Sequence, residues 1–408
     1  MITSSPMNQH LYRDVRKPSE APVLEVTVGT GQAMFRGDDH FAIQGAVDYV
    51  ARLGGGRVRL LPGTYTLRNA VFLPSEVTLT GSGPETVLST GASLSLPLIE
   101  DCDWCDWSIK VTDTSGFRVG DGITIYSERI DGGSITQVSL HTIVGIEDGR
   151  LHLDSLPRMD HWMQHNARVV STHSLLESRC AHNVRIENLT LDGNAAENET
   201  FDGNYGAAIF LHDTEKIHIN NIHINDYNGD AISWQICHDV TVENCTISNI
   251  TQLGLHPGSG SQRPVMRGNT INHCNDGIFW CWDVRHGIAE NNVISHCKRH
   301  GISTGHRDTD NVIRGNKISH CAETGIYFRP ERSAAKTSHR VLVEANTIEI
   351  GKDSPQSIGI SVVRGVEDVI LKDNRILLPS SQTARAIVIA EEAIRPVSEG
   401  NEIVTYAA

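Results

Sequence analysis

The chain is poor in aromatic residues, lacks long apolar runs and has no excess of positive charge. Only 5% of its 408 residues are aromatic while 39% are hydrophobic, so a core must be built mainly from aliphatic side chains. No apolar run reaches the roughly 18–20 residues that cross a bilayer. The net charge of −14 leaves no overall basic surface of the kind that attracts nucleic acid or anionic lipid. We therefore expect neither nucleic acid nor a membrane as a partner.

The sequence also lacks a secretory signal and a paired zinc-binding motif. The opening MITSSPMNQHLYRDVRKPSE has no apolar signal-peptide core. This predicts a cytoplasmic protein, or a secreted or periplasmic one if a leader has been removed. Nine cysteines are present, and DCDWCDW (101–107) contains one C-x-x-C pair, but no second pair stands at metal-site distance. We expect reduced, mostly packed thiols and no metal site.

An asparagine recurs just before a short β-type run along most of the chain, as in RIENLTL, TVENCTI, VIRGNKI and ILKDNRI. These asparagines stand at positions 188, 221, 244, 269, 292, 316, 346 and 374. Units this short, without a helical pattern, cannot bury an apolar face alone, but stacking them into a parallel β-helix does so. Asn at a tight turn can adopt the left-handed conformation and hydrogen-bond to the Asn of the next coil.

A second repeated element lies between the asparagines. A small residue precedes an aliphatic one in DAISWQ, LGLHPG, DGIFWC, HGISTG, TGIYFR and IGISVV, which begin at residues 230, 253, 276, 300, 324 and 358. The aliphatic residues are expected to stack inside the helix. Cys274, Cys297 and Cys321 each follow their Asn by five residues, which predicts one internal rung. The preceding histidines, at 273, 296 and 320, predict a ladder of turn residues rather than a metal site.

The ends and one internal stretch depart from this period. Residues 38–56 have apolar positions at helical spacing, which predicts an amphipathic helix that plugs the open end of the stack. Residues 104–175 are expected to form a β-rich insertion. The predicted division is an N-terminal extension (1–37), capping helix and first coils (38–103), the insertion, regular coils with the candidate site (176–380) and a C-terminal cap without repeats (381–408).

The stretch AIQGAVDYVARLGGGRVRLLPGTYTL…LPSEVTLTGSG, followed by the coil repeats, resembles the pectate-lyase-like right-handed parallel β-helix superfamily. The resemblance implies an all-β, right-handed parallel β-helix over most of residues 40–378. That superfamily includes lyases, glycosidases, epimerases, fructotransferases and non-catalytic adhesins. The polygalacturonase motifs and the calcium-binding Asp cluster of pectate lyases are absent, so no catalytic residue is carried over and function must be argued from the site.

The strands that follow the small residues predict one outward-facing patch. With the aliphatic residue inward, residues two, four and six places after the small one should point outward. Two places on are Ser233, His256, Phe279, Ser303, Tyr327 and Ser361; four places on are Gln235, Gly258, Cys281, Gly305, Arg329 and Val363; six places on are Cys237, Gly260, Asp283, Arg307, Glu331 and Gly365. Because adjacent coils lie about 4.8 Å apart, we expect a shared patch of His256, Asp283, Arg307, Tyr327, Arg329 and Glu331.

Several neighbours of this patch are candidates for substrate contact. Gly258 and Gly305 leave room for a sugar ring to approach the backbone, beside Gln235. Trp282 either stacks on a pyranose face or belongs to the core. His306 follows Gly305 and either turns inward or joins the site.

Two acidic residues flank the patch. Asp308 sits at the turn after Arg307 and is expected to join the catalytic group. Asp230 precedes its small residue, as Asp276 and His300 do in later coils. It is either a turn residue or a substrate-binding residue.

Two chemistries compete for this patch. In β-elimination at a uronic acid, His256 or Tyr327 would take the proton α to the carboxylate, and Arg307 and Arg329 would bind that carboxylate. In hydrolysis or transglycosylation, Asp283 would work with Glu331 at about 10 Å or with Asp308 one coil away. Glu331 has a plainer reading as a salt-bridge partner of Arg329.

The sequence thus predicts a carbohydrate-active enzyme, a polysaccharide lyase in the first place and a glycoside hydrolase or transglycosidase as the alternative. A non-catalytic glycan-binding β-helix is the third reading. The expected partner is a polysaccharide or oligosaccharide, and a homo-oligomer remains open. No cofactor is expected; a divalent cation such as calcium is compatible with the fold, but no motif indicates it.

Overall fold

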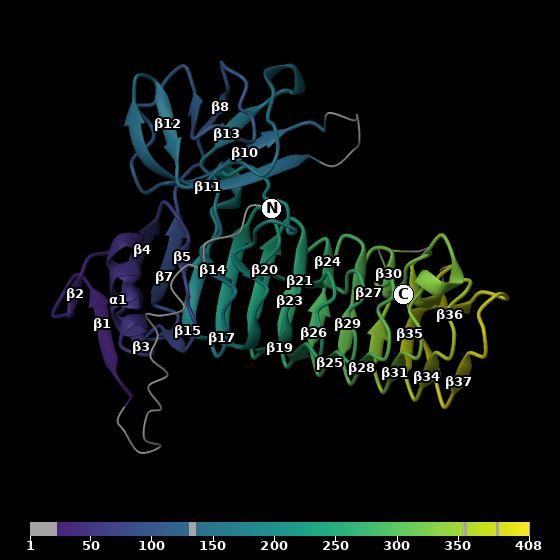
Figure 1. The fold of residues 1–408 in the computed structure, drawn as a ribbon. Coiled ribbons are helices and arrows are strands. Elements are labelled where there is room, and N and C mark those ends of the chain that lie inside the picture. The colour runs from purple at the N-terminus through teal and green to yellow at the C-terminus, as the bar shows by residue number, and fades with distance from the viewer. Residues whose placement is uncertain (1–22, 130–135, 353, 355–356, 381–382, 408) are drawn as a thin grey trace.

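The computed structural model describes residues 23–129, 136–352, 354, 357–380 and 383–407, which form a right-handed parallel β-helix with a small barrel inserted near its start (Figure 1). The predicted fold class, with one helix at the N-terminal end, is confirmed. Stacked aliphatic side chains from nearly every coil fill the interior, among them Ile232, Leu255, Ile278 and Ile302, all fully buried.

One wall of the β-helix is a ten-stranded parallel sheet whose outer face carries the candidate site. Its strands, in chain order, are β5 (Val71–Phe72), β14 (Leu176–Arg179), β16 (Ile209–His212), β18 (Ile232–Gln235), β21 (Leu253–Gly258), β24 (Asp276–Phe279), β27 (His300–Thr304), β30 (Thr324–Phe328), β33 (Ile358–Val362) and β36 (Arg385–Ile389).

The remaining walls form a 22-stranded parallel sheet. Its strands are β1 (Glu25–Gly29), β2 (Phe35–Arg36), β3 (Gly56–Leu60), β4 (Gly63–Leu67), β6 (Val77–Thr80), β7 (Thr86–Thr90), β15 (Arg185–Asp192), β17 (Glu215–Tyr227), β19 (His238–Glu243), β20 (Thr246–Ile250), β22 (Val265–Arg267), β23 (Thr270–Asn272), β25 (Ile288–Glu290), β26 (Val293–Ser295), β28 (Val312–Arg314), β29 (Lys317–Ser319), β31 (Leu342–Glu344), β32 (Thr347–Glu349), β34 (Ile370–Lys372), β35 (Arg375–Pro379), β37 (Val397–Glu399) and β38 (Glu402–Tyr406).

Helix α1 (His40–Arg52) closes the N-terminal end of the stack. Asp39 caps it by accepting a hydrogen bond from the Ala42 N–H at 2.9 Å. Its buried face, which includes Ile43, Val47 and Val50, packs against the first coil. The three 3-10 turns are η1 (Met163–His165), η2 (Ala195–Glu197) and η3 (Ala334–Lys336). Within the described ranges, no helix has the length and apolarity to cross a bilayer.

An asparagine ladder ties the later coils together, but it differs from the predicted arrangement. Asn292 donates from Nδ2 to Oδ1 of Asn316 at 2.9 Å, and the same type of bond links the buried residues 269, 292, 316, 346 and 374 and ends at the half-buried Asn401. The left-handed residue in these turns is the one before the ladder Asn, such as Gly315. Only in the earlier coils does the repeating Asn itself, for example Asn244, have positive φ.

The repeated cysteines lie in the core, and the repeated histidines form a stack on the surface. Cys274, Cys297 and Cys321 are buried, as predicted. The exposed imidazole rings of His273 and His296 stack with centroids 5.0 Å apart, and His320 continues the stack at the same spacing. All nine cysteines are free thiols.

The insertion is a six-stranded antiparallel sheet with a separate apolar core. Its strands are β8 (Ser95–Pro97), β9 (Ser108–Lys110), β10 (Gly122–Ser127), β11 (Gln137–Glu147), β12 (Arg150–Leu153) and β13 (Arg168–Val170). A bridge between Leu98 and Val111 joins the two edge strands, so the sheet closes into a barrel. The first barrel strand precedes the expected start at residue 104.

The C-terminal segment forms one more coil instead of the expected cap without repeats. Strands β36, β37 and β38 pair in parallel with the strands of the preceding coil. Asn401 extends the asparagine ladder by accepting from Asn374 at 2.9 Å. The strands of this last coil are short and exposed, so its sequence lacks the apolar pattern of the earlier repeats.

Candidate functional site

A break in strand alternation decides which residues face outward from the ten-stranded sheet. In β21 and β24, Leu253 pairs with Asp276 and Leu255 pairs with Ile278. The glycines between them, Gly254 and Gly277, do not take part in the regular strand pairing. A Cβ on Gly254 would lie 2.4 Å from the carbonyl oxygen of Gly277, which explains the small residue. The residue directly before each small one, such as Asp230, therefore lies on the same outer face as the residue two places after it.

Asp230 and His256 meet on this face as a buried ion pair. His256 Nδ1 lies 2.7 Å from Asp230 Oδ2, and both side chains are at most 5% exposed. Burial acts to lower the pKa of His256, but Asp230 and the neighbouring Cys281 outweigh it and raise the pKa to about 10. His256 Nε2 is buried and has no hydrogen-bond partner in the described part of the chain. A sealed imidazolium does not fit the general base expected at His256.

The loop that follows η2 covers this pair. Ser233 Oγ donates to the carbonyl oxygen of Gly203 at 2.6 Å. A Cβ on Gly203 would lie 1.7 Å from Asp230 Oδ2, so only glycine permits this approach. Gln235 is buried beside it, where its Nε2 donates to Ser233 Oγ at 3.1 Å, and it is not open to a ligand.

Arg329 fills the space expected to be a groove. Its guanidinium donates to Ser303 Oγ at 2.8 Å and to the Trp280 carbonyl oxygen at 2.6 Å. It also lies 4.0 Å from the centre of the Phe279 ring. The missing side chain of Gly305 makes room for the guanidinium, because a Cβ there would lie 2.6 Å from Arg329 Nε.

Asp308 is a buried turn residue rather than an outward-facing carboxylate. Its two oxygens accept hydrogen bonds from the Val284 N–H at 3.0 Å and the Gly305 N–H at 2.8 Å. Burial raises its pKa to about 7, against the lowering effect of Arg329 3.4 Å away. The predicted catalytic role at Asp308 therefore lacks access.

The predicted row of Asp283, Arg307 and Glu331 does not form. Asp283 and Arg307 have positive φ and lie in turns, where strand alternation no longer applies. The Asp283 N–H donates to the carbonyl oxygen of His306, 23 residues later, whereas the Arg307 N–H donates to that of Lys336, 29 residues later. The next coil is therefore six residues longer, and Glu331 does not reach this row. Asp283 instead pairs with Arg285 of its own turn at 2.6 Å.

Glu331 belongs to a different small cluster. Its Oε2 lies 3.1 Å from Nδ1 of His306, not beside Arg329 as the plainer reading expected. The His306 ring stacks on Trp282 with centroids 4.7 Å apart, and Trp282 is 58% exposed. Trp282 is therefore a surface residue rather than a core one.

Tyr327 lies on the outer face as predicted, next to residues that the sequence reading did not select. Its ring stacks on His300 with centroids 4.3 Å apart. Burial, with Arg299 and Arg329 nearby, lowers the pKa of His300 to about 3. Burial also raises the pKa of Asp276 to about 6, and its Oδ2 lacks a partner among the described residues.

A cavity on this face lies at its N-terminal end, where the barrel stands opposite the sheet. It has a volume of about 480 Å³ and is lined by β14, β16, the barrel and the loop after η2. The floor of the cavity extends the two outward rows predicted two and four places after the small residue. In this extension Glu177 pairs with Phe210, and Arg179 pairs with His212. Phe210 and His212 pair in turn with Ser233 and Gln235.

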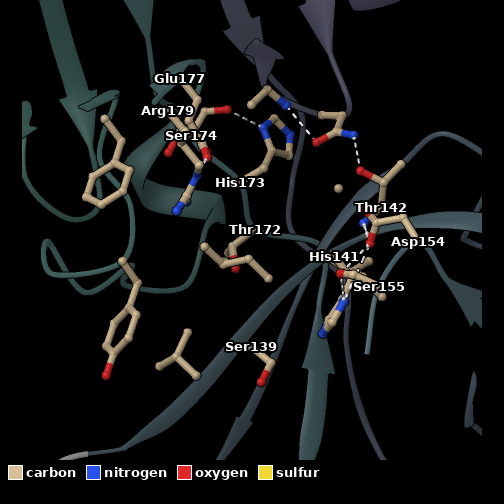
Figure 2. Close-up of a pocket in the computed structure, with 18 of the residues that line it drawn as sticks. Ser139, His141, Thr142, Asp154, Ser155, Thr172, His173, Ser174, Glu177 and Arg179 are labelled. Atoms are coloured by element: carbon tan, nitrogen blue, oxygen red, sulfur yellow. Dashed lines mark hydrogen bonds and ion pairs between the residues drawn. The ribbon is translucent and has the colours of Figure 1, made fainter. Parts of the chain in front are cut away.

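Charged groups face one another across this cavity. Figure 2 shows Glu177 and Arg179 on one side and His141, Thr142 and Asp154 on the other. Arg179 Nε is ion-paired with Glu177 Oε1, and burial raises the pKa of Glu177. The guanidinium of Arg179 also lies 5.2 Å from the centre of the Phe210 ring.

His212 lines this cavity together with two cationic side chains. Burial lowers its pKa, and Arg179 and Arg158 lower it further. Arg158 also lines the cavity, and no ion pair with a described carboxylate holds it. Tyr205 lines the cavity from the covering loop, and burial together with Asp202 raises its pKa.

The barrel wall holds a fixed carboxylate. Asp154 Oδ1 accepts from the Thr142 N–H at 3.0 Å, and His141 Nδ1 bonds to Ser155 Oγ at 3.2 Å. Burial acts to raise the pKa of Asp154, but the hydrogen bonds from His141 and Thr142 outweigh it and lower the pKa. Across the described ranges, no group of three or more His, Cys, Asp and Glu side chains is arranged to hold a metal.

The sequence contained one signal for the cavity floor. AAIFLH (207–212) has the same small–aliphatic pattern as the later coils and places Phe210 and His212 on the outward rows. The barrel wall carries no such signal, because its residues reach the cavity only through docking of the inserted domain.

Comparison with known proteins agrees with this architecture. A family model described as right handed beta helix region matches residues 207–376. The chain has the fold of a right-handed parallel β-helix. No curated protein matches the sequence of this β-helix protein.

Three solved structures resemble the β-helix protein over most of their length. A glycoside hydrolase has a TM-score of 0.57 at 11% identity, covering 93% of this chain and 96% of its own. The Thermotoga maritima exopolygalacturonase has 0.52 at 14%, covering 90% and 89%. The A-module of the Azotobacter vinelandii mannuronan C-5 epimerase AlgE6 has 0.51 at 14%, covering 91% and 96%. At these identities the likeness shows the fold alone.

Proposed function

We propose that the β-helix protein is a carbohydrate-active enzyme that cleaves a uronic-acid-containing polysaccharide by β-elimination in the cavity between barrel and sheet. The observation that carries this proposal is the cavity of about 480 Å³ that His212 lines together with Arg158 and Arg179, where burial and these two arginines lower the pKa of His212. A volume of this order suits a small ligand. Three fold relatives are named for carbohydrate chemistry, which supports a glycan substrate.

Each step of the elimination has a candidate side chain. Arg158 and Arg179 would bind the uronate carboxylate and stabilise the charge that develops on it. His212 would take the proton from the carbon α to that carboxylate. The electron pair of the broken C–H bond forms a C=C bond and expels the glycosidic oxygen at the β-carbon. The Tyr205 hydroxyl would give that oxygen its proton.

Of the residues selected from the sequence, only Asp230 and His256 have a supporting role in this proposal. Asp230 and His256 lie beneath the loop that carries Tyr205 and would position it. Tyr327, Arg329 and the Trp282–His306 pair lie farther along the β-helix.

Glycoside hydrolysis is the second candidate because two carboxyl groups of the cavity have pKa values pushed in opposite directions. Burial raises the pKa of Glu177, while hydrogen bonds lower that of Asp154. Such a division suits a general acid and an ionised partner.

The two reactions give different products from a uronate polymer. We expect the ultraviolet absorbance of an unsaturated uronate to rise with wild-type protein. His212→Asn should lower the rate at least about 100-fold, since positioned proton transfer contributes about 10²–10⁴-fold. His182→Asn, a surface histidine outside the cavity, should retain the wild-type rate.

New reducing ends without ultraviolet absorbance, lost in Glu177→Gln but retained in His212→Asn, would contradict elimination and support hydrolysis.

A further inference from the structure

Two tryptophans of the barrel are exposed on one turn. Trp104 is 62% exposed and Trp107 is 58% exposed. Both belong to the DCDWCDW stretch, which the proposed reaction does not use. Aromatic residues such as tryptophan are enriched at contact surfaces relative to the rest of a protein surface.

This turn is held in a fixed shape by hydrogen bonds. The Trp104 N–H donates to Asp160 Oδ1 at 2.8 Å, and the Asp103 N–H donates to Asp106 Oδ2 at 2.8 Å. Trp162 Nε1 donates to Asp103 Oδ1 at 2.9 Å. A rigid turn presents its aromatic rings at little entropic cost on binding.

The turn adjoins a wall of the cavity. The Trp107 carbonyl oxygen accepts from the Leu153 N–H at 2.9 Å, and Trp104 is bonded to Asp160. Between these two anchors, the segment 154–159 contributes Asp154, Arg158 and Met159 to the cavity lining. The tryptophan turn is therefore bonded to both flanks of the segment that carries Arg158, which places it next to this wall of the cavity.

Size and charge select the ligand. At about 150–250 Å² per tryptophan, two rings about 60% exposed offer roughly 200–300 Å². A protein partner needs about 800 Å² per side, whereas one or two sugar rings need far less. Four aspartates surround the turn, at 101, 103, 106 and 160, so an anionic sugar is disfavoured there.

We propose that the Trp104–Trp107 turn is a second carbohydrate-binding surface that stacks neutral sugar rings of the substrate. The inference rests on the proposed function in one respect: the acidic residue of the same polysaccharide occupies the cavity. It therefore describes the substrate as a heteropolysaccharide with both uronate and neutral units.

The test measures binding directly, by calorimetry on the full chain. The probes are neutral hexasaccharides (cellohexaose, mannohexaose and xylohexaose) and a hexagalacturonate, the last added to the His212→Asn variant. We expect at least one neutral probe to bind, with Trp104→Ala and Trp107→Ala each weakening it at least tenfold. Ile403→Ala, which removes an exposed side chain on β38, serves as the matched control and should bind as wild type.

Hexagalacturonate should respond in the opposite way. Relative to His212→Asn alone, the double variant with Arg158→Ala should lose affinity for it. The double variant of His212→Asn with Trp104→Ala should keep that affinity. Equal affinity of the tryptophan variants and wild type for every neutral probe, or no binding of any of them, would overturn the second surface. If uronate polymers are not cleaved while the tryptophan variants still lose neutral-sugar binding, the proposed reaction fails and the binding surface stands.

Discussion

The two ends of the ten-stranded sheet carry similar side chains on their outer face but differ in what stands opposite. At the N-terminal end the barrel faces Glu177, Arg179 and His212 and leaves a cavity of about 480 Å³. At the C-terminal end Arg329 and Tyr327 lie against their own neighbours. Titratable and aromatic residues on a solenoid wall therefore do not by themselves make a site. A second wall must hold space open above them.

Two histidines of this sheet show the same contrast electrostatically. His212 borders the cavity, and burial together with two arginines lowers its pKa. His256 lies two coils farther on, and its bond to Asp230 raises its pKa to about 10. One imidazole is suited to accept a proton and the other to hold a loop.

The largest effect we expect outside the proposed reaction concerns this buried pair. Asp230→Asn removes one partner and leaves the other buried, which typically costs about 3–5 kcal/mol of unfolding free energy. The folded pKa of His256 lies above its usual 6.5, so its stabilisation is complete below pH 6.5 and is lost as pH rises through about 10. Urea unfolding between pH 6 and pH 10 should show this loss in wild type and little of it in Asp230→Asn.

Asp283→Asn provides the control in the next coil, because the Asp283 side chain is 40% exposed and is ion-paired with Arg285 of its own turn. Its unfolding free energy should stay close to that of wild type. A pH dependence as steep in Asp230→Asn as in wild type would show that the ion pair does not contribute.

A smaller effect is expected where the loop covers the pair. Gly203→Ala would place a methyl group against Asp230 and push the Tyr205 loop outward, at a cost of about 1–3 kcal/mol. Activity on a uronate polymer should fall at least tenfold. Gly91→Ala is the matched control, since a Cβ there meets nothing within 4 Å. Equal activity of the two variants would mean that the loop does not position Tyr205.

Most of the fold could be predicted because its signals are local and repeated. The small–aliphatic pairs, such as Gly277–Ile278 and Gly301–Ile302, recur in every regular coil and fix which side chains enter the core. The last coil was missed because its strands are short and exposed, although Asn401 continues the ladder.

The candidate site was predicted only in part because strand alternation fails at both ends of each strand. The register of the rows two and four places after the small residue is confirmed by the pairing of Ser233 with His256 and of Gln235 with Gly258. Asp283 and Arg307 lie in turns with positive φ, where the side-chain direction no longer follows the strand. Arg329 pointed as expected, but its hydrogen bonds to Ser303 and Trp280 could not be read from spacing.

The cavity itself needs contacts between segments far apart in the sequence. Arg158 belongs to the barrel and His212 to the sheet, and only their docking brings both to one space. A repeat pattern specifies neighbours one coil apart, but it does not say where an inserted domain will stand.

The most direct test of this account is a crystal structure of His212→Asn with an acidic oligosaccharide bound. We expect a uronate carboxylate within hydrogen-bonding distance of Arg158 or Arg179, with its ring beside position 212 and the chain leading toward Trp107. A sugar bound over Trp282 and Arg307, with the space between barrel and sheet empty, would contradict it.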